Sequence, residues 1–189
     1  MIGRRLKVKG NIKEYVKWIL RGEIPTRVLI NRGLVVGENF NRQRNCTIDP
    51  PHCWLISIGN NVALAPGVHI LAHDGSTKQM LGYTKVGRVY IGNNVFIGAE
   101  TVVLPNVKIG DDCIIGAASV VTKDIPSSSV AVGNPARVIM TTQEYLQKNK
   151  EQMNKTNLYD ESYTFSENLS LAKKQEMKDD LKEKIGYVV

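Results

Sequence analysis

Aliphatic residues recur every six positions along the middle of this 189-residue chain. Residues 91–126 divide into six consecutive hexapeptides, IGNNVF, IGAETV, VLPNVK, IGDDCI, IGAASV and VTKDIP, each led by Ile or Val. The same spacing occurs earlier, in IGNNVA, LAPGVH and IL from residue 58. A period of six is too long for one helical turn and is not simple strand alternation. It predicts a short strand followed by a turn, repeated at constant length.

The repeat also predicts which side chains are buried. Alternation within a strand sends Val68 and Ile70 inward and His69 outward. We expect the residue after each inward aliphatic, often Gly, to turn the corner, because Gly tolerates unusual dihedrals. Three such sides close a triangular coil, and stacked coils bury ladders of aliphatic side chains. The predicted fold class is therefore an all-β core, a left-handed parallel β-helix.

The two ends of the chain depart from this repeat. Apolar residues at helical spacing between residues 12 and 20, followed by Gly22, predict a short amphipathic helix. Such a helix would either cap the first coil, which we favour, or lie on a membrane surface. A second helical pattern covers residues 166–185. We predict an N-terminal cap over residues 1–25, a β-helix over 26–140 and a polar helical extension over 141–189.

The repeat is interrupted twice, and upstream it is irregular. Ile30, Val36 and Ile48 keep the phase, but Arg42 stands where an aliphatic residue is expected. About four extra residues are inserted near positions 50–55, and a longer excursion occupies residues 73–89. Insertions in a solenoid form loops on one face, which is often the functional face.

His73 opens the long excursion, in the sequence HILAHDGSTK. It either merely begins a loop or acts as a general base, since His accepts a proton near neutral pH. The other two histidines give weaker signals: His69 is expected on the surface, and His52 lies beside two prolines in the shorter insertion.

The end of the repeat has little side-chain bulk. Residues 116–119 read GAAS, so an extended ligand could lie against the backbone there. Thr122, Lys123 and Arg137 follow, and their hydroxyl and two cations would suit a phosphate. The alternative is an ordinary last coil with solvated charges.

Charge and cysteine content narrow the class of protein. A formal net charge of +7 favours anionic partners. Nucleic-acid binding is not expected, because basic and aromatic residues are not interleaved. Three cysteines without a CxxC pair predict reduced thiols, and the N-terminus lacks the apolar run of a signal peptide. We therefore expect a soluble cytoplasmic protein.

The segment IGNNVFIGAETVVLPNVKIGDDCIIGAASVVTKDIP, followed by VGNPARVI, resembles the bacterial hexapeptide acetyltransferases of the maltose, galactoside and nodulation type. The resemblance covers roughly residues 39–139. Segments such as IDPPHCWLISIG and HILAHD are more similar to acetyltransferases encoded in surface-polysaccharide clusters. The resemblance implies a homotrimer that binds acetyl-CoA, its co-substrate, in a groove between adjacent β-helices, with no metal expected.

The resemblance also implies roles for individual residues. His73 takes the place of the catalytic base, and the backbone of Ala99 and Ala117 would contact the pantetheine arm. The residues expected near the adenosine phosphates are Thr122, Lys123 and Arg137.

The acceptor side of the site is less clearly marked. Asn41, in the sequence NFN, matches a position that faces the acceptor, and Tyr83 and Lys85 lie in the excursion. Members that acetylate sugars carry an acidic pair with no clear counterpart here, and Asp49 is the nearest carboxylate. They also usually carry Trp where this chain has Phe96.

The predicted function is acetyl transfer from acetyl-CoA to a hydroxyl of a sugar or polysaccharide precursor. Alternatives are N-acetylation of an amino-sugar nucleotide, serine acetylation and a structural β-helix without activity. A metal-dependent hydratase of the γ-carbonic anhydrase kind is a further alternative, although the spacing of His52, His69 and His73 differs from its ligands.

Overall fold

A computed structural model describes residues 22–189, which form two compact units, one ending at Thr142 and the other spanning Gln143–Val189. The helix predicted between residues 12 and 20 lies outside the described residues. The described chain begins with a short helix, α2 (Thr26–Asn31), whose Leu29 is buried. Ile30 lies in this helix and not in a coil, so its place in the six-residue phase was coincidental. Within residues 22–189, no helix is long and apolar enough to span a membrane.

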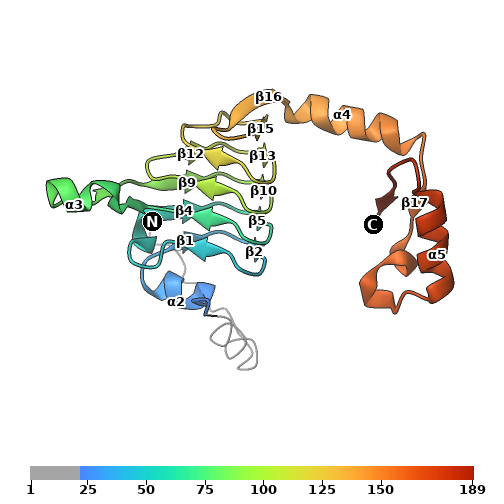
Figure 1. Ribbon diagram of the computed structural model, residues 1–189, viewed down its shortest axis with the longest axis horizontal. Coiled ribbons are helices and arrows are strands. Elements are labelled where there is room, and N and C mark those ends of the chain that lie inside the picture. Colours follow the sequence, from blue (N-terminus) through green and yellow to red (C-terminus); the bar gives the residue numbers. More distant parts are fainter. Residues whose placement is uncertain (1–21) are drawn as a thin grey trace. The chain divides into compact units, whose positions relative to one another are not determined.

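The first unit is a parallel β-helix with three sheets (Figure 1). Sheet 1 consists of β1 (Val35–Val36), β4 (Ile56–Ile58), β9 (Val89–Ile91) and β12 (Lys108–Ile109). Sheet 2 contains β2 (Asn41–Arg42), β5 (Ala63–Leu64), β10 (Phe96–Ile97), β13 (Ile114–Ile115), β15 (Ser129–Val132) and β16 (Arg137–Thr141). Sheet 3 consists of β3 (Thr47–Ile48), β6 (His69–Ile70), β11 (Val102–Val103) and β14 (Val120–Val121). Within these three sheets, β16 alone is antiparallel to its neighbour, and it lies at the end of sheet 2.

The six-residue repeat predicts the core of this unit correctly. Leading aliphatics stack in register, as in the ladder Ile48, Ile70, Val103 and Val121 of sheet 3. All of them are buried, and so are the residues four positions later in each hexapeptide. The two polar members of that second set, Thr101 and Ser119, both donate hydrogen bonds to the Gly116 carbonyl, at 3.1 and 2.7 Å. The buried hydroxyls therefore find partners inside the coil.

The prediction for the repeat glycines was wrong in its mechanism. Gly59, Gly92, Gly98, Gly110 and Gly116 do not have positive φ. Left-handed backbone occurs two residues later, mostly at Asn or Asp, which tolerate it best among residues with a side chain. The glycines are needed because coils stack closely: a Cβ on Gly98 would lie 2.5 Å from a backbone nitrogen of the next coil.

Arg42 takes an inward position at the open end of the first coil. Its guanidinium donates to the carbonyl of Ile24 at 2.8 Å and to the carbonyl of Cys46. Burial lowers the pKa of this guanidinium. Arg42 thus donates hydrogen bonds to backbone carbonyls at the end of the stack, where no further coil covers them. This explains why position 42 is not an aliphatic residue.

Both insertions leave the β-helix at the corner between sheet 3 and sheet 1. The first follows β3 and contains the short 3-10 helix η1 (Cys53–Leu55) before β4 begins. The second follows β6 and forms an antiparallel hairpin, β7 (His73–Asp74) with β8 (Lys85–Val86), tipped by η2 (Gly75–Thr77) and α3 (Lys78–Leu81). In Figure 1 this hairpin projects away from the stacked coils. The two loops therefore start one coil apart.

The second unit contains α4 (Thr142–Met153), α5 (Leu171–Asp180), the short turns η3 (Glu161–Tyr163) and η4 (Phe165–Glu167), and a parallel pair formed by β17 (Leu158–Tyr159) and β18 (Tyr187–Val188). The helix predicted over residues 166–185 is shorter, because the Ser170 side chain accepts the N–H of Lys173 and caps α5 at that point. Tyr159, in β17, is the buried residue of this second unit, and the Tyr159 hydroxyl donates to Asp180 at 3.0 Å.

Candidate active site

The shared corner brings together Asp49 and His73, which are 24 residues apart in sequence. Asp49 directly follows β3, and its N–H donates to the Ile70 carbonyl of the coil above at 2.9 Å. His73 begins the hairpin three residues after that carbonyl. The parallel register of β3 and β6 therefore places the two side chains in adjacent layers.

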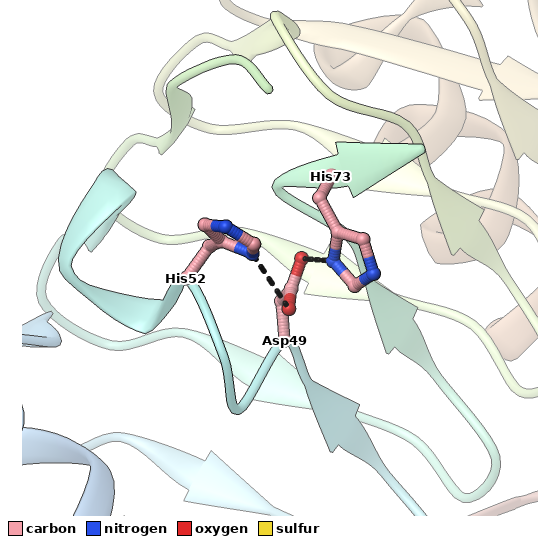
Figure 2. A group of neighbouring side chains, drawn as sticks. All are labelled: Asp49, His52 and His73. Carbon is pink, nitrogen blue, oxygen red and sulfur yellow. Dashed lines mark hydrogen bonds and ion pairs between the residues drawn. The ribbon is translucent and has the colours of Figure 1, made fainter. Parts of the chain in front are cut away.

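The Asp49 carboxylate is fully buried and contacts the His73 ring directly (Figure 2). Its Oδ2 lies 2.6 Å from His73 Nδ1 and also accepts the N–H of Ala72 at 2.7 Å. An ionised carboxylate only accepts hydrogen bonds, so it fixes the proton of a neutral imidazole on Nδ1. His73 Nε2 then carries a free lone pair, and in Figure 2 this atom points away from Asp49. The His73 side chain is 35% exposed, so a substrate can reach it.

His52 completes the group of side chains in Figure 2 and was not predicted to be functional. Its ring centroid lies 4.9 Å from that of His73 and 5.4 Å from that of Trp54. His52 Nδ1 is 3.9 Å from Asp49 Oδ1, which is too long for a hydrogen bond. One ligand-type atom from each of Asp49, His52 and His73 lies within 4.8 Å of the others. The signal for this cluster was the common origin of the two insertions at one corner.

The hairpin holds its own ion pair. Lys85 Nζ lies 2.6 Å from Asp74 Oδ2, and this contact lowers the pKa of the Asp74 carboxyl to about 2. Tyr83 is 79% exposed, and its carbonyl accepts a hydrogen bond from Thr77 Oγ1 at 2.8 Å. Of the two hairpin residues predicted to bind the acceptor, Tyr83 is therefore open to solvent and Lys85 is paired.

Thr122 and Lys123 are exposed at the same corner as Asp49, but farther along the stack. Thr122 follows Val121 as Asp49 follows Ile48, and these aliphatics belong to one ladder of four strands. Three strand spacings separate the two positions by about 14 Å. An elongated ligand could therefore span the distance from Thr122 to His73 along the corner.

The other predicted cofactor residues lie elsewhere on the β-helix. Ala99 and Ala117 stack at the corner between sheets 2 and 3, where the Ala118 N–H donates to the Ala99 carbonyl at 2.7 Å. Arg137 opens β16 and is exposed. Asn41 is also exposed, on sheet 2, where its Oδ1 accepts from Gln43 at 3.0 Å. A single chain does not bring these residues to His73.

The cysteines are structural. Cys46, Cys53 and Cys113 are free and buried, and burial raises the pKa of the Cys46 and Cys113 thiols. Cys53 Sγ lies 3.6 Å from the Leu29 carbonyl and Cys113 Sγ 3.1 Å from the Pro126 carbonyl. A raised pKa disfavours the thiolate that a nucleophile needs.

Comparison with known proteins identifies the repeat. The model of the bacterial transferase hexapeptide, with six repeats, matches residues 88–123. Protein CapG of Staphylococcus aureus is 48% identical over 96 residues, 49% of this chain and 56% of CapG. Galactoside O-acetyltransferase of Escherichia coli K12 is 40% identical over 122 residues, 62% of this chain and 58% of that enzyme.

A solved structure supports the same relationship. The maltose O-acetyltransferase of Clostridium difficile 630 superposes with a TM-score of 0.52 at 45% identity, covering 58% of this chain and 59% of the other. The chain thus spans little more than half the length of these relatives. The match implies the left-handed winding predicted from the repeat. Residues 88–123 thus carry the six-residue repeat of bacterial hexapeptide transferases.

Proposed function

We propose that this protein is an acetyltransferase that transfers the acetyl group of acetyl-CoA to a hydroxyl of a sugar or sugar-containing precursor. The observation that carries the proposal is the 2.6 Å contact between buried Asp49 Oδ2 and His73 Nδ1, which directs a basic Nε2 outward. The names of the relatives, galactoside and maltose O-acetyltransferase, support the donor and the acceptor class.

The reaction needs a base and a positioned thioester. His73 Nε2 removes the proton of the acceptor hydroxyl while the hydroxyl oxygen attacks the thioester carbonyl. Asp49 acts through His73, because its negative charge stabilises the imidazolium that forms. Coenzyme A leaves as a thiolate and takes the proton from His73, which restores the neutral base. No covalent enzyme intermediate forms, in agreement with three buried cysteines.

We infer that the active form is a homotrimer. Thr122 and Lys123 share a corner with His73, whereas Ala99 and Ala117 lie at a different corner. A cofactor that contacts both sets must lie between two β-helices, with one corner from each. In this arrangement Arg137, Thr122 and Lys123 contact the phosphates of coenzyme A, and the backbone at Ala99 and Ala117 contacts its pantetheine arm.

We assign acceptor binding to the surface around the His73 hairpin. Exposed Tyr83 offers an aromatic face suited to a sugar, and the amide of Asn41, on sheet 2, would come from an adjacent β-helix of the trimer. Asp49 is assigned to positioning His73 and not to holding the acceptor, because its side chain has no exposed surface. Free thiols in a soluble enzyme suit the cytoplasm.

The test is an assay of thiol release from acetyl-CoA across a panel of sugars, amino sugars and serine. We expect release with sugar hydroxyl acceptors and a loss of about 10²–10⁴-fold in kcat for His73→Ala. His69→Ala is the matched control, because His69 faces outward on β6 and should leave the rate unchanged. Near-wild-type activity of His73→Ala, or no release with any sugar, contradicts the proposal; preferential use of amino groups or serine favours the alternative acceptors.

A further inference from the structure

Two buried polar atoms face each other beside the proposed base without a partner. Asp49 Oδ1 and His52 Nδ1 have almost no accessible surface, and no described residue donates to or accepts from either. They lie 3.9 Å apart. The Asp49 side chain is fully buried, so this oxygen carries part of a charge that is removed from water on that side.

Leaving such groups unmatched is unfavourable. A buried polar atom without a hydrogen bond loses the interaction it had with water. A proton shared between Oδ1 and Nδ1 would need them about 1 Å closer. A cation between them needs no such approach, because each atom bonds to the ion and not to the other.

We propose that Asp49, His52 and His73 form a site for a divalent transition metal of the Zn²⁺ type, and that the bound metal inhibits acetyl transfer. The binding part stands on the cluster alone; the inhibition part rests on the proposed function. One ligand-type atom from each residue lies within 4.8 Å of the others, and we assign Asp49 Oδ1, His52 Nδ1 and His73 Nδ1 as the ligands.

The geometry is close to that of a metal site. Two ligands bound to tetrahedral Zn²⁺ at about 2.1 Å are about 3.4 Å apart. The observed 3.9 Å between Oδ1 and His52 Nδ1 therefore needs only a small side-chain rotation. Both imidazoles are partly exposed, at 28% and 35%, which leaves a fourth position for water.

The donor set selects the class of ion. Two imidazole nitrogens and one carboxylate oxygen suit Zn²⁺ and its neighbours in the first transition row. Mg²⁺ and Ca²⁺ prefer all-oxygen sets and should bind weakly. The nearby thiol of Cys53 is buried and directed to the Leu29 carbonyl, so it is not counted as a ligand.

Metal binding and base catalysis compete for one nitrogen. When the metal takes the lone pair of His73 Nδ1, the proton held there moves to Nε2, and the ring stays neutral. Nε2 then carries hydrogen and cannot accept a proton from a hydroxyl. Asp49 Oδ2 keeps the Ala72 N–H but loses the His73 proton, so the His73 ring rotates away from Oδ2 when the metal binds.

The binding test is calorimetric titration of the full-length protein, free of any histidine tag, with ZnCl₂, and with CoCl₂ for its visible spectrum. We expect one Zn²⁺ per chain and a Co²⁺ spectrum typical of tetrahedral coordination. Replacement of His52 by Asn should weaken Zn²⁺ binding at least ~10–100-fold, since loss of a ligand costs no less than loss of its supporting contacts. The variant His52→Phe removes the ligand but retains a ring against Trp54 and His73, and His69→Asn controls for surface histidines.

The activity test uses the same variants. Zn²⁺ should inhibit the wild-type protein and His69→Asn, whereas His52→Asn and His52→Phe should be active without metal and resistant to it. Unchanged Zn²⁺ affinity in both His52 variants, or no binding to the wild type at ~0.1 mM, overturns the metal site. Stoichiometric binding without inhibition overturns the competition for Nδ1. Binding in a protein that transfers no acetyl group rejects the proposed function and leaves the metal site standing.

Discussion

Replacing Asp49 with Asn isolates the charge of the buried carboxylate from its geometry. The amide oxygen can occupy the place of Oδ2 and accept the same two N–H groups, from Ala72 and from His73. The amide nitrogen then faces His52 Nδ1, which accepts a hydrogen bond when the ring carries its proton on Nε2. The position and tautomer of His73 should therefore survive, while the negative charge is lost.

The magnitude follows from the separation of the charges. With Nδ1 and Oδ2 at 2.6 Å, the centres of an imidazolium and the carboxylate are about 4 Å apart, worth about 4 kcal/mol at an effective dielectric constant of ~20. If about half of the charge has developed in the transition state, the loss is about 2 kcal/mol, or ~30-fold in rate. We expect Asp49→Asn to lower kcat 10- to 100-fold and to leave KM nearly unchanged.

The assay is steady-state acetyl transfer for the wild type, Asp49→Asn, His73→Ala and the double variant. Since Asp49 acts through His73, adding Asp49→Asn to His73→Ala should cost no more than ~2-fold. A purely structural role would lower the rate again in the double variant and would lower thermal stability to match. A kcat for Asp49→Asn within ~3-fold of the wild type refutes the electrostatic reasoning.

Three further predictions concern the scaffold and the hairpin. Ile97 is fully buried, so Ile97→Ala should lower the free energy of unfolding by about 2–5 kcal/mol in urea titrations, unless the coil collapses around the cavity. Gly98→Ala should cost about 1–3 kcal/mol because its Cβ meets backbone at 2.5 Å, whereas Gly75→Ala, with nothing within 4 Å, should be tolerated in the same titrations. The Asp74 carboxyl has a pKa of about 2 in the folded protein, below the ordinary 3.8, so its ion pair stabilises the hairpin above pH 4 and is lost as the pH falls toward 2. Lys85→Met should return the Asp74 pKa toward 3.8 in NMR titrations of the carboxyl carbon, and an unchanged value would show that Lys85 does not cause the shift.

The sequence predicts the scaffold well because every hexapeptide shows the same pattern of buried and exposed residues. Each coil imposes the same demand for an inward aliphatic, so the strands around Leu64, Ile97 and Ile115 follow from spacing alone. The role of the glycines could not be predicted. A Gly required by close packing between coils looks the same in the sequence as a Gly required by a positive φ. Arg42 was recognisable as a break in the aliphatic pattern. Its hydrogen-bond partners could not be predicted, because the repeat does not determine the positions of the segments that carry them.

The site was only half predictable for a related reason. His73 stands out because it opens the longest break in the repeat. Its link to Asp49 depends on register: Ile48 and Ile70 belong to one ladder, so the residues after them meet at one corner. That argument was available from the phase of the repeat. The position of His52 could not be predicted in this way. Two prolines and a 3-10 turn orient its side chain, and this segment does not follow the six-residue repeat.

The common exit of both loops at one corner lets the hairpin, proposed above to bind the acceptor, be exchanged without moving the coils. Coils of a solenoid contact only their neighbours, so the strands on either side of the hairpin, β6 and β9, keep their register whatever length of chain joins them. Doubling a flexible loop costs only about 0.6 kcal/mol in closure entropy. A chimera could therefore exchange the hairpin beyond Asp74 for one from a hexapeptide acetyltransferase and keep Asp49 and His73 in place. Under the proposed function, such a chimera should keep acetyl transfer and take its acceptor preference from the protein that supplied the hairpin.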